Sequence, residues 1–148
     1  MQLSEHTFSR QMSKPLDFIG INTEIIKASK NEKDVLIAAQ DASFIPKFGT
    51  STPGLDYFWD GSASKAEKGL EIDVIAVVKI GDKKAGYTIS AEQTPANPVP
   101  KSEGKKKKVT DFTKIDLCIS HVKKTQKQLV DLGIEYMAVD AFFAKKIC

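Results

Sequence analysis

The sequence predicts an α/β protein with a mixed sheet, and two observations carry this prediction. Residues 35–41 and 134–140 are apolar runs of strand length, typical of strands buried on both faces, and each ends on an aspartate. Between them lie two alternating segments and then one segment with a helical period. A helical crossover returns a strand parallel to an earlier one. We therefore expect a three-stranded antiparallel meander, a helix, and a fourth strand parallel to the first.

The second and third strands follow from alternation. Residues 70–80 alternate between two faces, and we expect the wholly apolar face to be the buried one. That face comprises Leu70, Ile72, Val74, Ala76, Val78 and Ile80. Asp73 lies on the other face, expected to be half covered, as an acid that could be mistaken for a metal ligand. Gly81-Asp82 is a hairpin turn pair that leads into a third strand at residues 83–92.

Two helices are expected. Ser13-Lys14-Pro15 predicts the start of the first, because proline suits the first helical turn, and the helix would run to Ser29. Its buried stripe would comprise Leu16, Ile19, Ile25 and Ile26.

The second helix would begin at a cap formed by Thr110 or Asp111 and end at Gly133. Its buried stripe would comprise Phe112, Ile115, Ile119, Val122, Gln126 and Leu129. His121 is expected on the helix surface.

Composition limits the class of protein. The 148 residues suit one modest domain, and the net charge of +3 permits a polyanionic partner without requiring one. Cys118 and Cys148 match no zinc or redox spacing, which suggests a reducing compartment. No apolar run approaches the ~18 residues of a membrane span, and the first residues are not a secretory signal. We expect a cytoplasmic protein without a membrane partner.

Two polar stretches leave alternatives open. Residues 50–69 predict a long loop, in which Tyr57-Phe58-Trp59 would either pin the loop to the core or stack on nucleotide bases. The four lysines at 105–108 would be either a solvated cluster or a source of salt-sensitive phosphate contacts.

Asp41 and Asp140 form the candidate site. If their strands are parallel neighbours, both acids emerge at the same carboxyl edge of the sheet, where α/β proteins bind ligands. Two close carboxylates repel one another unless a cation bridges them, and carboxylates suit Mg²⁺ or Mn²⁺. Such a pair points to phosphoryl transfer. The alternative is an ordinary α/β domain in which both aspartates only cap turns.

Two groups of motifs resemble the DDE transposases of bacterial insertion sequences, with the insertion sequence four type closest. The first-aspartate motif is matched by the run from Asp41 to Gly49, then Gly54, Phe58-Trp59, Gly61, Lys68-Gly69 and Ser90-Ala91-Glu92-Gln93-Thr94. The second-aspartate motif is matched by Leu132-Gly133-Ile134 and the run from Asp140 to Lys145.

The resemblance implies a ribonuclease-H-like fold, with residues 1–34 as a partly helical lead-in and 35–148 as part of the catalytic domain. It implies that Asp41 and Asp140 are catalytic ligands of Mg²⁺ or Mn²⁺. Double-stranded DNA at transposon ends would be the substrate, and a second transposase chain a further partner. The residues implied to contact DNA are Ser43, Lys47, Lys65, Lys68 and Lys145.

The third acid of that family, a glutamate, has no counterpart here, since residues 141–148 contain no acidic residue. We therefore expect a truncated catalytic domain, incomplete at the C-terminus and inactive in strand transfer by itself. The alternatives are a non-enzymatic DNA-binding remnant that regulates a full-length transposase, or a small α/β domain of unrelated role.

Overall fold

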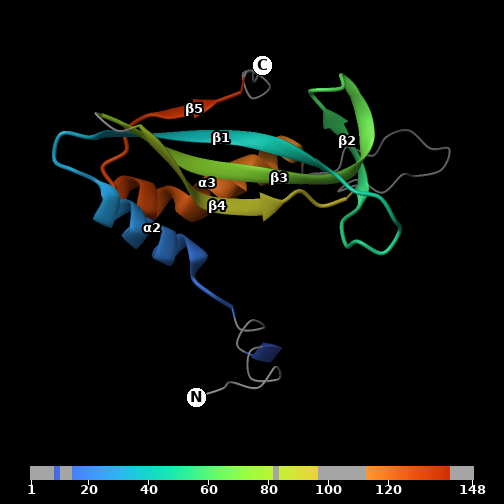
Figure 1. Ribbon diagram of the computed structural model, residues 1–148, viewed down its shortest axis with the longest axis horizontal. Helices are drawn as coiled ribbons and strands as arrows, with labels where there is room; N and C mark the ends of the chain where they lie inside the picture. Colours follow the sequence, from blue (N-terminus) through green and yellow to red (C-terminus); the bar gives the residue numbers. More distant parts are fainter. Residues whose placement is uncertain (1–8, 11–14, 82–83, 97–112, 141–148) are drawn as a thin grey trace.

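The computed structural model describes residues 9–10, 15–81, 84–96 and 113–140 (Figure 1). The chain is an α/β protein with a mixed sheet of five strands in the order β2-β3-β1-β5, in which β4 also pairs with β3. The elements are α2 (Phe18–Ser29), β1 (Val35–Pro46), β2 (Asp56–Asp60), β3 (Lys65–Ile80), β4 (Ala85–Gln93), α3 (Lys114–Asp131) and β5 (Met137–Val139).

The antiparallel pair of β1 and β3 forms the middle of the sheet. Its ladder runs from Val35 opposite Ile80 to Pro46 opposite Gly69, and β4 pairs antiparallel with the other edge of β3. The predicted meander of long strands is therefore confirmed. The predicted end of the first strand at Asp41 is wrong, because β1 continues past this residue and keeps pairing with β3 as far as Pro46.

The fourth strand of the prediction, β5, lies parallel to β1 as expected. The pairs run from Ala38 opposite Met137 to Gln40 opposite Val139, and α3 forms the crossover that precedes β5. The strand covers only part of the predicted range 134–140, because Ile134 still donates its N–H to the carbonyl of Leu129 at the end of α3.

The long loop predicted at residues 50–69 is wrong. β2 lies within this range, and β3 begins at Lys65, so the two strands form an antiparallel hairpin. Figure 1 shows this hairpin rising from the end of the sheet that lies away from α2. At its base, a Cβ on Gly69 would overlap the carbonyl oxygen of Ile45 and the ring of Phe44. Glycine therefore allows the close approach between β1 and β3 at this point.

The first helix begins later than predicted. Asp17 is its N-cap and accepts a hydrogen bond from the N–H of Gly20 at 2.8 Å, whereas Pro15 precedes the helix. Ser13 and Lys14 lie outside the described residues. Of the predicted stripe, Ile26 is buried and Ile19 packs against the core, but Leu16 and Ile25 are exposed.

The second helix is capped by Thr113, not by Thr110 or Asp111, which lie outside the described residues. Thr113 and Asp116 form a capping box, and Gly133 adopts a positive φ of 73° just beyond the helix end, as its predicted closing role requires. Of the predicted stripe, Leu129 is buried and Val122 packs against the core, whereas Ile119 and Gln126 are exposed and Phe112 lies outside the described residues. The buried positions are Cys118, His121, Thr125 and Leu129.

The core lies between one face of the sheet and the two helices. It comprises Ile26 of α2, Leu36 and Ala38 of β1, Ile75 and Val77 of β3, Ile89 of β4, and Leu129 and Leu132. The predicted buried face of β3 is therefore wrong. The helices cover the face that carries Glu71, Asp73, Ile75, Val77 and Lys79, all of them buried.

We call the opposite side of β1 and β3 the open face. It carries Ile37, Ala39, Asp41 and Ser43 of β1, and Leu70, Ile72, Val74, Ala76 and Val78 of β3. Its apolar side chains are half-buried by their neighbours in the sheet. Within the described ranges, both helices pack on the other side, and neither is long and apolar enough to cross a membrane.

Candidate functional site

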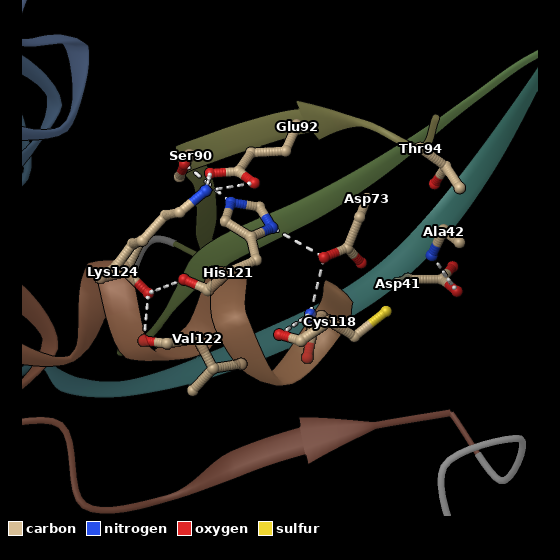
Figure 2. A network of polar contacts seen from close by, with 12 residues as sticks. Asp41, Ala42, Asp73, Ser90, Glu92, Thr94, Cys118, His121, Val122 and Lys124 are labelled. Atoms are coloured by element: carbon tan, nitrogen blue, oxygen red, sulfur yellow. Dashed lines mark hydrogen bonds and ion pairs between the residues drawn. The ribbon is translucent and has the colours of Figure 1, made fainter. Parts of the chain in front are cut away.

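Asp41 lies on the open face, opposite Val74 of β3, and its side chain is exposed. Its carboxylate accepts a hydrogen bond from the N–H of Ala42 at 2.9 Å (Figure 2). Asp41 does not end the strand, but it is the first residue of β1 beyond the ladder with β5, which stops at Gln40 opposite Val139. On the β5 side, the backbone of β1 is thus unpaired from Asp41 onwards within the described residues.

Asp140 directly follows β5 and is exposed. The parallel register of β1 and β5 ends with Gln40 opposite Val139, so Asp41 and Asp140 are the next residues on the two strands. Adjacent strands lie ~4.8 Å apart. The sheet therefore brings the two predicted acids to neighbouring positions on one edge, although they are 99 positions apart in sequence (140 − 41 = 99).

The structure describes four of the five residues that the resemblance implies to contact DNA. Ser43 lies on the open face two residues beyond Asp41, and Lys47 is exposed just after β1. Lys68 is exposed and donates to the carbonyl of Gly49 at 2.8 Å. Lys65 instead forms an ion pair with Glu67 at 2.6 Å. Lys145 and the lysines at 105–108 lie outside the described residues.

The aromatic cluster of the predicted loop lies on β2. Tyr57 and Trp59 have 68% and 63% of their surface exposed, whereas Phe58 is half-buried. The interpretation that the whole cluster pins a loop to the core therefore does not hold for Tyr57 and Trp59.

A buried polar network joins α3 to the sheet beneath this edge, and sequence reasoning missed it. Nδ1 of His121 lies 2.7 Å from Oδ2 of Asp73, and Nε2 lies 2.8 Å from Oγ of Ser90 (Figure 2). Gln40, the residue before Asp41, donates to the same Oδ2 of Asp73 at 2.7 Å and to the carbonyl of Cys118 at 3.3 Å. The prediction that His121 lies on the surface is wrong, since it is 1% exposed.

A β-bulge places Ser90 in this network. The register of β3 and β4 passes from Ile75 opposite Ser90 to Ala76 opposite Thr88, which leaves Ile89 as the extra residue. Both Ile89 and Ser90 are consequently buried under the helices.

The order Ser90–His121–Asp73 has the connectivity of a hydrolase triad, but it is closed to substrate. The three residues are 8%, 1% and 5% exposed, and α3 covers them. A nucleophile must reach a substrate carbonyl or phosphorus. We therefore assign the network a structural role: it satisfies buried polar groups and holds α3 on the sheet. Oδ1 of Asp73 is buried without a hydrogen-bond partner in the described structure.

Cys118 lies next to this network and is also buried. Burial raises the pKa of its thiol to about 11, and the nearby Asp73 carboxylate contributes in the same direction. A thiol with this pKa stays protonated near neutral pH and is a poor nucleophile. Cys118 is thus a packing residue.

Two further charged residues on the covered face of β3 have partners from other elements. Glu71 pairs with Lys114 of α3 at 2.7 Å, and Lys79 pairs with Asp34 at 3.4 Å. Lys79 also donates to the carbonyl of Ser29 at the end of α2, at 3.1 Å. Sequence alternation alone could not reveal these partners, because they come from segments distant in the chain.

Asp41 and Asp140 are both exposed and lie at neighbouring positions. Within the described ranges, no group of three or more His, Cys, Asp or Glu side chains is placed to hold a metal ion. Two neighbouring carboxylates fit part of the ligand set of Mg²⁺ or Mn²⁺, because these ions retain water and share substrate phosphates. Two carboxylates supply only part of the six oxygen ligands that such an ion takes.

No protein-family model, no curated protein and no solved structure matches the chain.

Proposed function

We propose that this chain forms part of the catalytic domain of a DDE transposase of the insertion sequence four type, acting in the cytoplasm in the transposition of an insertion sequence. In this proposal the sheet is ribonuclease-H-like. Asp41 and Asp140 bind Mg²⁺ or Mn²⁺, and the substrate is double-stranded DNA at the transposon ends, with a second transposase chain as a further partner.

One observation carries the proposal: the parallel register of β1 and β5, which makes Asp41 and Asp140 neighbours on an accessible edge. Carboxylates in adjacent positions repel one another, and a divalent cation between them removes that cost. Such a cation stabilises the charge that develops on phosphate oxygens during strand cleavage. The strand order β4-β3-β1-β5 is also compatible with the ribonuclease-H-like arrangement that the resemblance implies.

Each residue of the proposed site would have a separate role. Asp41 and Asp140 would hold the cation, and Ser43, two residues further along the open face, would lie near the DNA backbone. The buried network would fix β1, since Asp73 binds Gln40 directly before Asp41.

Binding of Mn²⁺ tests the proposal without requiring turnover. Titration with Mn²⁺, followed by paramagnetic broadening of backbone amide signals, should broaden the residues around Asp41 and Asp140 first. Asp41→Asn and Asp140→Asn should each weaken binding at least about ten-fold. Replacing a residue that only supports a metal ligand already lowers metal affinity by about that factor. Asp56→Asn, which removes a carboxylate on β2, is the matched control and should leave binding unchanged.

Unchanged Mn²⁺ affinity in Asp41→Asn would contradict the proposal. Binding of DNA that needs no metal and survives both substitutions would instead favour the alternative, a non-enzymatic DNA-binding remnant that regulates a full-length transposase. Metal-dependent cleavage of transposon-end DNA by this chain, lost in Asp41→Ala, would show that the expected inactivity is wrong.

A further inference from the structure

The hairpin formed by β2 and residues 65–69 of β3 has two chemically different sides. On one side, Tyr57 lies opposite Lys68 and Trp59 lies opposite Ala66. We call these four residues the aromatic side. Their side chains are exposed, and Lys68 is the charged residue among them.

The acids of the hairpin lie on its other side. Asp56 lies opposite Gly69, Phe58 opposite Glu67, and Asp60 opposite Lys65. Lys65 is engaged by Glu67 at 2.6 Å. Asp60 accepts from the backbone and hydroxyl of Ser62 in the turn, at 2.8 and 2.6 Å. The hairpin thus separates a cation and two exposed rings from three carboxylates, which suits an anionic partner on the aromatic side.

Contacts at the base of the hairpin hold the aromatic side in place. Lys68 donates to the carbonyl of Gly49 at 2.8 Å, and the N–H of Lys47 donates to the carbonyl of Lys68 at 3.4 Å. These contacts hold Lys68, the cross-strand partner of Tyr57, and bring the exposed Lys47 to the same end of the sheet. The close approach of Gly69 to Ile45 further ties the hairpin to β1.

The two rings have a spacing that suits nucleotide bases. Tyr57 and Trp59 are two residues apart on one side of a strand, which separates their Cα atoms by ~6.8 Å along β2. That separation is about twice the ~3.4 Å rise between stacked bases. Every base has a flat π-face, so stacking on exposed aromatic rings needs unpaired bases but no particular sequence.

The aromatic side also continues toward Asp41. Lys68, Leu70, Ile72 and Val74 alternate onto the same side of β3, and Val74 lies opposite Asp41. Six residues of strand span at most ~20 Å. A nucleic-acid strand that stacks on the rings could therefore follow the open face to the two acids.

We propose that the aromatic side binds single-stranded nucleic acid, with unpaired bases stacked on Tyr57 and Trp59 and the backbone phosphates held by Lys68 and Lys47. This inference deepens the proposed function and rests on it in one respect, because an unpaired strand at a transposon end, held here, would be the one presented to Asp41 and Asp140. The stacking itself requires neither metal nor catalysis.

Trp59 makes the proposal directly measurable, since it is the single tryptophan of the sequence. The full chain is titrated in EDTA with an oligothymidine of about twelve nucleotides, within the ~4–16 nucleotides that single-strand-binding surfaces cover. We expect saturable quenching of the Trp59 emission by the single strand and at least about ten-fold weaker binding of a duplex of the same length.

Matched variants separate stacking from charge. With a fluorescein-labelled oligothymidine, Tyr57→Ala and Trp59→Ala should each weaken binding by about ten-fold, and Trp59→Phe should retain most of it. Lys68→Ala should lower the slope of log K against log salt by ~0.7, the effect of one phosphate contact. Lys123→Ala removes an exposed lysine on α3, away from the hairpin, and should leave both affinity and slope unchanged. Circular dichroism confirms that each variant is folded.

Quenching by the duplex as strong as by the single strand would overturn the inference, as would equal effects of Lys123→Ala and Lys68→Ala. Absence of any quenching would also overturn it and would leave the hairpin as a contact for protein. Because the titration is done without metal, its failure alongside Mn²⁺ binding at Asp41 and Asp140 would leave the proposed function standing. Single-strand binding without Mn²⁺ binding would support the inference while the proposed function fails.

Discussion

At the scale of single residues, three charged side chains of β3 are buried because each finds a partner on another element. Asp73 meets His121 of α3, Glu71 meets Lys114 of α3, and Lys79 reaches the end of α2. Burying an unpaired charge is costly, whereas a paired and hydrogen-bonded one is tolerated. These contacts therefore specify where each helix sits on the sheet.

His121→Ala tests the strongest of these contacts. Removing the imidazole leaves Asp73 buried with Gln40 as its remaining side-chain donor, since Oδ1 already has no partner in the described structure. We expect a loss of about 3 kcal/mol in the free energy of unfolding, because the substitution takes a hydrogen-bond partner from a buried carboxyl group. Urea denaturation followed by circular dichroism measures it.

Ser90→Ala is the matched control for His121→Ala. It removes a single hydroxyl contact to the same imidazole and should cost about 1 kcal/mol. Equal losses for both substitutions would contradict the view that the Asp73 carboxylate dominates the network.

The sequence predicts that Asp41 and Asp140 are neighbours, but it does not predict which face of β3 the helices cover. Asp140 follows its strand as predicted, whereas Asp41 lies within β1; the register of β1 and β5 nevertheless makes the two acids neighbours, as expected. The covered face of β3 could not be predicted, because both faces of residues 70–80 carry apolar side chains. The partners of the charged side chains on the covered face also lie far away in the sequence. The burial of His121 could not be predicted either, because its partners Asp73 and Ser90 lie far away in the sequence.

At the scale of elements, α3 is fixed at both ends by local chemistry. The hydroxyl of Thr113 accepts from the N–H of Asp116 at 3.3 Å, and the Asp116 carboxylate accepts from the N–H and hydroxyl of Thr113 at 2.6 and 2.7 Å. Gly133 takes the positive φ that closes the helix. Local contacts therefore define both limits of the helix.

Thr113→Ala should lower the free energy of unfolding by about 1 kcal/mol, because it leaves N–H groups of the first turn without an acceptor. Thermal or urea unfolding at pH 7 measures this loss. Thr113→Ser keeps the hydroxyl and is the control, expected to lie close to the wild type.

The capping box of Thr113 and Asp116 also predicts how the destabilisation by Asp116→Asn depends on pH. The hydrogen bonds from Thr113 lower the pKa of the Asp116 carboxyl in the folded protein. A lowered pKa means that the carboxylate stabilises the fold above about pH 4 and loses this effect as the pH falls through the folded pKa. The difference between wild type and Asp116→Asn should therefore shrink in acid; a difference that grows would contradict the role of the carboxylate.

Elements differ in how far the sequence determines them. The long strands and α3 follow from apolar periods that packing reinforces, so their existence is predictable. β2 was missed because its residues, Asp56–Asp60, lie between glycine-rich stretches that resemble a loop, and its pairing with Lys65–Gly69 arises only in the folded hairpin. The helix limits were missed because several residues compete as caps.

At the scale of the whole molecule, the sheet is covered on one side only within the described residues. Ile26, Leu129 and Leu132 from the helical side pack on β1, β3 and β4, while the open face keeps a row of half-buried apolar side chains around Asp41. The order and direction of the strands were predictable from the helical crossover, but the side on which the helices pack was not. A one-sided sheet combines a stable core with an accessible edge for the two acids.

Val77 and Val78 offer a matched test of this arrangement, since they are identical residues adjacent on β3. Val77 is 0% exposed within the core, whereas Val78 lies half-buried on the open face. Val77→Lys should cost about 4 kcal/mol or more, or prevent folding, because it buries an unpaired charge. Val78→Lys should cost less than about 1 kcal/mol, since a lysine there can extend its ammonium into water.

Urea denaturation of the two variants measures the difference, and light scattering adds a second readout. An exposed apolar surface favours self-association, so Val78→Lys should also reduce scattering at high protein concentration. Equal destabilisation by the two substitutions would mean that the open face is as tightly covered as the core. The acids at its edge would then be out of reach of DNA, and the proposed function would lose its structural support.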